Sequence, residues 1–153
     1  MTGLELKVPP PVVALVLALA MWLVARFTLT LEVGVTLRAA VAMAVALVGG
    51  AFSAAGAASF RQAQTTLNPM KPEEASSLVT TGIYRFTRNP MYVGALLVLL
   101  GWAVFLCAPW ALFGPAVFVL YMNRFQIAPE ERVLLSSFGE GYAAYRAKVR
   151  RWL

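Results

Sequence analysis

The chain has 153 residues, of which 60% are hydrophobic and only 13% are charged, and its mean hydropathy is +0.72. Average soluble domains are about 45–50% apolar and about 25% charged, so this chain has too few charges to cover a water-exposed surface. It has no histidine and one cysteine, Cys107, which excludes Ser-His and Cys-His catalysis, zinc sites built on those residues and an intrachain disulfide. The net charge of +6 indicates contact with anionic membrane lipids rather than nucleic acid. The composition predicts an integral membrane protein that binds no metal.

Four apolar stretches predict membrane-spanning helices. They cover residues 12–29, 37–60, 91–107 and 110–127. A cluster of three prolines, Pro9 to Pro11, stops the first helix from beginning earlier. Because Lys7 precedes this stretch, a cleaved signal peptide is the competing interpretation, although the stretch is long for one and lacks a clean small-residue cleavage site.

The second stretch is rich in small residues that recur four positions apart. Such spacing lets the backbones of two membrane helices approach closely. The residues concerned are Gly49, Ser53 and Ala57 in one row, and Gly50 and Ala54 in another. The third and fourth stretches meet at a tight turn marked by Pro109 and Trp110, which predicts an antiparallel hairpin. A buried helical hairpin of a soluble protein is the alternative, and the overall composition disfavours it.

The distribution of charge predicts the topology, because cytoplasmic loops of membrane proteins carry an excess of Lys and Arg. The opposite side has only Arg26 and Arg38, near the first turn. Basic residues gather between the second and third stretches and after the fourth: Arg61, Lys71, Arg85, Arg88, Arg124, Arg132, Arg146, Lys148, Arg150 and Arg151. Both termini are therefore predicted to be cytoplasmic. The preference for arginine over lysine and the abundant alanine hint at a GC-rich bacterial source, and so at the inner membrane.

The last stretch, from Pro129 to Leu153, is too polar to span a membrane. Apolar residues recur in it at spacings of three and four, with basic residues between them: Val133, Leu134, Phe138, Tyr142, Tyr145 and Val149. This pattern predicts an amphipathic helix at the membrane surface, broken by Gly139 and Gly141. The predicted fold is an all-α integral membrane protein, a single membrane domain over residues 1–153 with about four transmembrane helices and a C-terminal interfacial helix.

Two polar clusters, residues 80–94 and 124–131, flank the last two predicted spans. Each has an ordinary structural interpretation, in which Asn89 and Pro90 start a helix, Arg88 anchors it at the membrane face and Gly94 packs. Glu130 and Glu131 would likewise favour a helix N-terminus. Two adjacent carboxylates beside a membrane are costly without partners, however, in a chain with only seven acids. The hairpin brings the two clusters together, which predicts a polar pocket roofed by the C-terminal helix.

One motif match is discounted. Residues 139–144 satisfy the G-x-G-x-x-A form of the dinucleotide fingerprint. That fingerprint requires a preceding strand and a following unit of about 30 residues. Here a helical pattern precedes the match and the sequence given ends soon after it.

Several ordered motifs together resemble one family of membrane enzymes. In sequence order they are Gly82, Tyr84, Arg88, Asn89, Pro90, Tyr92 and Gly94, then Glu130, Glu131 and Leu134, then Phe138, Gly139, Tyr142 and Tyr145, and finally Arg151, Trp152 and Leu153. This pattern is similar to that of the isoprenylcysteine carboxyl methyltransferase and phospholipid methyltransferase superfamily. The resemblance covers about the last half of the chain, from Thr80 onward, and the first two spans carry no motif.

The resemblance implies a membrane methyltransferase that uses S-adenosyl-L-methionine, with a cytoplasmic cofactor pocket in residues 80–153. The acceptor would reach the methyl group from the lipid through a gap between helices. The residues implied to bind the cofactor are Gly82, Tyr84, Arg88, Asn89, Pro90, Tyr92, Gly94, Glu130 and Glu131. Eukaryotic isoprenylcysteine enzymes have His before the Pro, whereas Asn89 exchanges hydrogen bonds but does not titrate near neutral pH.

Methyl transfer from an activated sulfonium needs mainly alignment, which suits a chain without His or metal. If the acceptor is an amine or thiol and requires a base, Glu131 is the candidate, and Arg124 could instead orient an acidic acceptor. The expected acceptor is a lipophilic small molecule: a prenylated thiol or carboxylate, a lipid amine or a small thiol. The alternatives are a non-catalytic helical membrane protein and a related NADPH-dependent membrane reductase.

Overall fold

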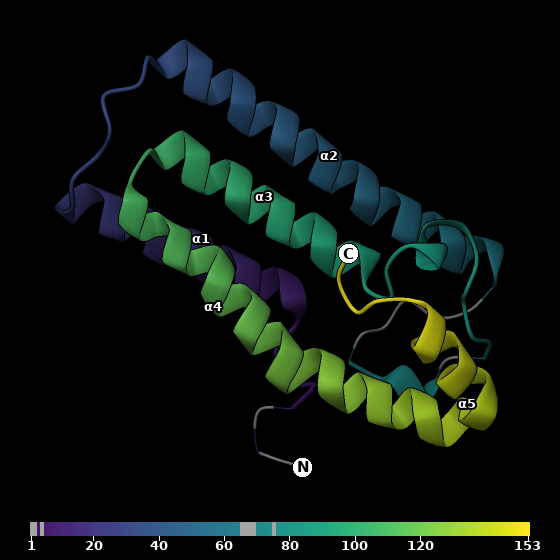
Figure 1. Cartoon of the computed structure of the whole chain (residues 1–153). Helices are drawn as coiled ribbons and strands as arrows, with labels where there is room; N and C mark the ends of the chain where they lie inside the picture. The colour runs from purple at the N-terminus through teal and green to yellow at the C-terminus, as the bar shows by residue number, and fades with distance from the viewer. Residues whose placement is uncertain (1–2, 4, 65–69, 75) are drawn as a thin grey trace.

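The computed structural model describes residues 3, 5–64, 70–74 and 76–153, and over these residues the regular structure is entirely helical (Figure 1). All four predicted apolar stretches and the C-terminal segment are helical. The α-helices are α1 (Pro10–Phe27), α2 (Val35–Gln62), α3 (Pro90–Leu106), α4 (Phe113–Tyr121) and α5 (Ala128–Lys148). Short 3₁₀ helices cover Pro72–Glu74, Gly82–Arg85 and Pro109–Leu112, and a π-helix covers Met122–Ile127.

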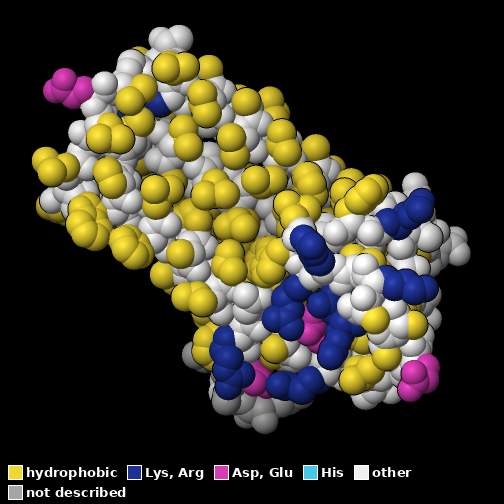
Figure 2. All heavy atoms as spheres, viewed as in Figure 1, with side chains coloured by type: hydrophobic (Ala, Val, Ile, Leu, Met, Phe, Trp, Pro, Cys, Tyr) yellow, Lys and Arg dark blue, Asp and Glu magenta, His cyan; other side chains and the backbone are white. Residues whose placement is uncertain are grey.

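Helices α1 and α2 are long and apolar enough to cross a membrane. They are also poorly buried, since only 17% of the apolar window of α1 and 11% of that of α2 is covered by the rest of the protein. Apolar side chains therefore cover much of the α1–α4 region on the face shown in Figure 2, and most of the charged ones gather at one end. An apolar surface of this extent is typical of contact with lipid. Helix α3 is apolar but has 17 residues, and the third and fourth spans stay predictions.

The fourth predicted span, residues 110–127, is helical but is not a single α-helix. It begins as a 3₁₀ turn, continues as the nine-residue α4 and ends as the π-helix Met122–Ile127. The π-helix runs directly into α5, so the predicted boundary before the C-terminal helix is absent. Instead α5 bends at Gly139, where φ is +51°, and this confirms the predicted break at that glycine. Gly141 lies within the helix beyond the bend.

The predicted small-residue row on α2 faces α3, and the two helices lie side by side (Figure 1). A Cβ added to Gly49 would lie 2.6 Å from the carbonyl oxygen of Gly94, and one added to Gly101 would lie 2.8 Å from that of Ala42. Both distances are shorter than real Cβ contacts, so the backbones can approach this closely only because these residues are glycines. The second row is different, because Gly50 has open space around it.

We expect Gly49→Ala to destabilise the protein and the neighbouring Gly50→Ala to stabilise it or leave it unchanged. The first forces α2 and α3 apart, and overpacking of this kind costs about 1–3 kcal/mol. The second gains helix propensity, about 1 kcal/mol in water, without meeting any atom. Thermal unfolding of both variants in the same detergent checks this. Equal melting temperatures for the two variants would contradict the close approach at Gly49.

The two turns predicted on the same side of the membrane do lie at the same end of the molecule. The backbone N–H of Leu31, between α1 and α2, donates to the carbonyl of Cys107, between α3 and α4, at 2.8 Å. The opposite end holds α5, residues 70–74 and 76–89, and the described part of the N-terminal segment (Figure 1). There Glu5 is buried and accepts from Arg124 at 3.3 Å and from Arg132 at 2.6 Å.

Candidate functional site

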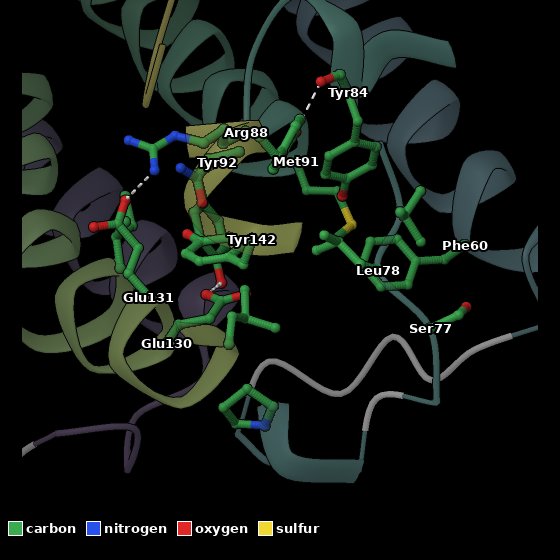
Figure 3. A pocket seen from close by; sticks show the side chains of 16 residues that line it. Phe60, Ser77, Leu78, Tyr84, Arg88, Met91, Tyr92, Glu130, Glu131 and Tyr142 are labelled. Atoms are coloured by element: carbon green, nitrogen blue, oxygen red, sulfur yellow. Dashed lines mark hydrogen bonds and ion pairs between the residues drawn. The ribbon is translucent and has the colours of Figure 1, made fainter. Parts of the chain in front are cut away.

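A pocket lies at the charged end, between the start of α3, the two halves of α5 and the segment Ser77–Tyr84 (Figure 3). Its walls are unusually aromatic, because four of the five tyrosines in the chain line it. The aromatic lining residues are Phe60, Tyr84, Tyr92, Tyr142 and Tyr145, and the charged ones are Arg88, Glu130 and Glu131. The predicted polar pocket, roofed by the C-terminal helix, is therefore present.

The start of α3 forms one wall of this pocket. Pro90 occupies the first turn, where its fixed φ suits a helix and its missing N–H is not needed. Asn89 precedes it but makes no side-chain cap, contrary to the ordinary structural interpretation. Its amide Nδ2 instead donates to the carbonyl of Arg151 at 2.9 Å. The departure from His at this position therefore preserves a hydrogen-bond donor, which is all that this contact requires.

Glu131 lies between two guanidinium groups. Its Oε1 is 3.1 Å from Nη1 of Arg88 and accepts from Nε of Arg151 at 3.1 Å, while its Oε2 accepts from Nη2 of Arg151 at 2.6 Å. The side chain of Glu131 is 10% exposed and that of Arg88 11%. Because the π-helix continues into α5, no free helix N-terminus faces Glu130 and Glu131, and a dipole does not explain their position. The two arginines account for the position of Glu131.

Glu130 is in a different environment from its neighbour. Its Oε2 accepts a hydrogen bond from the hydroxyl of Tyr92 at 3.1 Å. Burial raises the pKa of the Glu130 carboxyl to about 7, against the opposing effect of the Tyr92 hydrogen bond and with a further contribution from the charge of Glu131. Two adjacent glutamates thus differ in function at neutral pH: one is held by arginines, and the other exchanges a proton readily.

The tyrosines offer neutral hydroxyls and aromatic faces. Burial raises the pKa of Tyr142 to about 12, and burial likewise raises the pKa values of Tyr84 and Tyr145 above the usual range. The hydroxyl of Tyr145 donates to the carbonyl of Tyr84 at 2.8 Å, which joins α5 to the 3₁₀ helix Gly82–Arg85. Phe60 packs edge-on against Tyr84 with ring centroids 5.4 Å apart. Aromatic faces beside carboxylates attract cations.

Arg88 provides a binding group for an anion. Its Nε and Nη1 atoms are buried and have no hydrogen-bond partner of good geometry among the described residues, although Nη1 keeps its charge contact with Glu131. A buried donor without an acceptor is unfavourable, so these atoms suit a ligand carboxylate or hydroxyl. The pocket therefore combines sites for a cation and for an anion within one small volume.

A second, apolar cavity begins where the pocket ends. It is an open groove between α1, α2 and α3, lined mainly by small and apolar residues, among them Ala14, Ala18, Ala42, Ala46, Gly101 and Trp102. Met91 and Tyr92 line both the groove and the polar pocket. The two cavities thus meet at the first turn of α3. One end of the combined site is polar and aromatic, and the other is suited to a hydrocarbon chain.

The structure brings six of the predicted site residues to the pocket wall: Tyr84, Arg88, Asn89, Tyr92, Glu130 and Glu131. The other four lie outside the lining. Gly82 takes a positive φ of +61° against Ser59, Pro90 begins α3, and Gly94 packs on α2. Arg124, predicted to orient an acceptor, is 56% exposed and pairs with Glu5. We therefore give Arg124 no part in the site.

Several pocket residues were not predicted as site residues. Tyr142 and Tyr145 were assigned to the apolar face of an interfacial helix, although they belong to one of the quoted motifs. The bend at Gly139 turns that face toward the pocket. Nothing in the sequence pointed to Phe60 as a pocket residue, because it is one of many apolar residues in the second apolar stretch. Arg151 was visible in the C-terminal motif, but its contact with Glu131 was not.

The fold and this site define a helical membrane protein with a polar pocket at one end that opens onto an apolar groove. The family profile described as phospholipid methyltransferase matches residues 37–141, which is more than half of the chain. The chain belongs to this family, as the motif resemblance indicated.

The chain is also similar to individual proteins. An uncharacterized protein of Haemophilus influenzae is 49% identical over 63 residues, which are 41% of this chain and 100% of that protein. Protein-S-isoprenylcysteine O-methyltransferase of Xenopus laevis is 39% identical over 79 residues, covering 50% of this chain and 26% of the relative. Protein-S-isoprenylcysteine O-methyltransferase B of Arabidopsis thaliana is 36% identical over 85 residues, covering 56% and 43%. The chain thus spans less than half of these two named relatives.

Proposed function

We propose that the protein transfers a methyl group from S-adenosyl-L-methionine to a lipophilic acceptor at the membrane surface. The observation that carries this proposal is the junction of the two cavities at Met91 and Tyr92. A polar donor and an apolar acceptor can meet there without either leaving the environment that suits it. Family membership supports the reaction class.

The residues of the polar pocket fit the donor. S-adenosyl-L-methionine supplies an already activated methyl group on a sulfonium, together with an ammonium and a carboxylate. Glu130 and the tyrosine faces provide the environment for positive charge. The buried Nε and Nη1 of Arg88, which have no hydrogen-bond acceptor of good geometry among the described residues, provide donors for a carboxylate. Alignment of reacting groups alone supplies up to about 7–11 kcal/mol in model systems, so the pocket needs no covalent nucleophile.

The apolar groove fits the acceptor. It extends along α3 from Met91 to Phe105, which at 1.5 Å per residue is about 21 Å. This is the length of a long acyl or prenyl chain, and the apolar, laterally open lining admits such a chain from the lipid. The chain would place its polar end at Tyr92. A prenylated thiol or carboxylate and a lipid amine both meet this description, and a small thiol would leave the groove empty.

Glu130 is a better candidate than Glu131 for a base. The oxygens of Glu131 already make three contacts with arginine nitrogens, whereas Glu130 makes one hydrogen bond with Tyr92. Its pKa of about 7 also lets it accept a proton at neutral pH. We therefore propose that Glu130 takes the proton released by an amine or thiol acceptor, and that Glu131 organises the binding site.

The charge distribution supports a location for the site. We propose that the end bearing the pocket and α5 faces the cytoplasm of a bacterium, where S-adenosyl-L-methionine is made, and that four helical segments cross the inner membrane. The excess of basic residues at this end supports the orientation.

Binding of S-adenosylhomocysteine tests the proposal. We expect calorimetry on the purified protein in detergent to show about one site per chain, and Tyr92→Ala to weaken binding at least tenfold through loss of a wall shared by both cavities. Tyr121→Ala is the matched control, because Tyr121 is the one tyrosine outside the pocket lining. It should bind like the wild type.

A folded, monodisperse sample that binds no S-adenosylhomocysteine would overturn this function. The same sample should then be titrated with NADPH. Saturable binding would point to the reductase alternative. No binding of either compound would favour a non-catalytic membrane protein.

A further inference from the structure

We propose that residues Arg150 to Trp152 form a latch across the edge of the pocket, and that Arg151 is a positioning residue that fixes the carboxylate of Glu131. The proposal rests on the proposed function, because it assigns Arg151 a part in binding the methyl donor. Arg151 itself is not among the residues that line the pocket. It acts through Glu131, which is.

Backbone groups hold the latch against the start of α3. The N–H of Arg88 donates to the carbonyl of Arg150 at 2.9 Å. The carbonyl of Arg151 accepts twice, from Nδ2 of Asn89 at 2.9 Å and from the hydroxyl of Thr87 at 3.3 Å. The chain leaves the helical conformation at Val149, so these groups are available to residues outside α5. The latch is therefore docked on the same loop that carries Arg88 into the pocket.

Side chains of the latch then reach the helix on the other side. Arg151 binds both oxygens of Glu131, and its Nη1 donates to Oδ1 of Asn123 at 3.4 Å. The indole Nε1 of Trp152 donates to the same Asn123 oxygen at 3.1 Å. Asn123 lies in the π-helix, whose wider turn changes the direction of its side chains relative to an α-helix. This irregular turn thus has a binding partner, which is the latch.

The geometry explains why two arginines hold one glutamate. Arg88 contacts Glu131 through a single nitrogen, whereas Arg151 contacts it through two, in the planar fork that fixes a carboxylate most firmly. Without Arg151 the Glu131 side chain can rotate about its contact with Arg88. The nitrogens of Arg88 would then be drawn toward Glu131 rather than left for a ligand. Donor binding should weaken even though Arg151 touches no ligand.

A double-mutant cycle tests this action through Glu131. S-adenosylhomocysteine affinity is measured by calorimetry for wild type, Arg151→Gln, Glu131→Gln and the double variant. We expect Arg151→Gln to weaken binding about tenfold in the wild-type background and less than about twofold in the Glu131→Gln background. Arg151→Lys should bind S-adenosylhomocysteine more tightly than Arg151→Gln but less tightly than the wild type, because a lysine cannot reproduce the two-nitrogen contact. A purely structural role for Arg151 would give the same loss in both backgrounds and would overturn the proposal.

The adjacent arginine is the matched control. Arg150→Gln removes the same charge but leaves the backbone carbonyl that Arg88 binds, so affinity should stay within about twofold of wild type. Equal losses for Arg150→Gln and Arg151→Gln would show an effect of net charge and overturn the proposal.

Hydrogen exchange at the Arg88 amide separates this proposal from the proposed function. That N–H is protected by the carbonyl of Arg150, so Arg151→Gln should speed its exchange and Arg150→Gln should not. If wild type fails to bind S-adenosylhomocysteine, the methyltransferase assignment fails while faster exchange in Arg151→Gln still supports the latch. If wild type binds and Arg151→Gln changes neither affinity nor exchange, the latch fails and the methyltransferase assignment stands.

Discussion

Glu131→Ala is expected to lower the melting temperature and to weaken S-adenosylhomocysteine binding more than about tenfold, because Glu131 lines the pocket and fixes Arg88. The substitution leaves Arg88 and Arg151 facing each other without the carboxylate that separates them. Removing one partner of a buried ion pair costs about 3–5 kcal/mol of folding stability. We take the lower end of this range, because the Arg151 side chain is 35% exposed and partly screened.

Two further variants serve as comparisons for Glu131→Ala. Glu131→Gln keeps the shape and one hydrogen-bond acceptor, so its loss should be nearer tenfold. Glu140→Ala removes an exposed carboxylate from the same helix and should bind as the wild type does. Calorimetry measures affinity and thermal unfolding measures stability on the same samples. Wild-type affinity for Glu131→Ala would contradict the central place given to this residue.

The second large effect concerns pH and Glu130. The pKa of Glu130 in the folded protein is about 7, above its ordinary value of 4.5, so the folded state binds this proton more tightly than the unfolded state does. Stability from this group is fully present below about pH 4.5 and is lost as the pH rises through about 7. The loss is at most about 3 kcal/mol by pH 8. Glu130→Gln should therefore melt like the wild type at pH 4.5 and at a higher temperature at pH 8.

Donor binding should depend on pH in the opposite direction. An ionised Glu130 attracts the positive charge of S-adenosyl-L-methionine, so we expect its affinity to rise about tenfold between pH 6 and pH 8. The Glu130→Gln protein is the control, because it removes the titration of this carboxyl and leaves that of the ligand unchanged. A rise of the same size in that variant would assign the dependence to another group. Calorimetry at the two pH values makes the measurement.

Hydrophobic patterning was enough to predict the helices of the membrane region. Long apolar stretches between Pro, Gly and charged residues have few alternatives to a helix, and α1, α2 and α3 begin and end within two residues of the predicted boundaries. The small-residue row on α2 predicted a close helix–helix contact but not its partner, which the structure shows to be α3. The π-helix was not predictable, because its residues Met122 to Ile127 differ in no visible way from those of an α-helix. Its partners, Arg151 and Trp152, lie about 30 residues further along the chain.

The site was predictable where the motif residues themselves make the pocket wall. Arg88, Tyr92 and Glu130 combine a chemical function with a position beside a span, and both are visible in the sequence. The glycines were not distinguishable in this way. Gly94 belongs to the same motif, but it serves the contact between α2 and α3, since spacing alone does not say which face of a helix a residue occupies. Arg124 was misplaced for the same reason.

The presence of Tyr92 in the walls of both cavities has a thermodynamic consequence. A ligand in either cavity acts on the position of this ring and on its hydrogen bond to Glu130. By linkage, if occupation of the groove changes the affinity of the pocket by some factor, occupation of the pocket changes the affinity of the groove by the same factor. Under the proposed function, an acceptor chain in the groove would change how tightly the pocket holds the methyl donor, and a bound donor would change the affinity for the acceptor by the same factor.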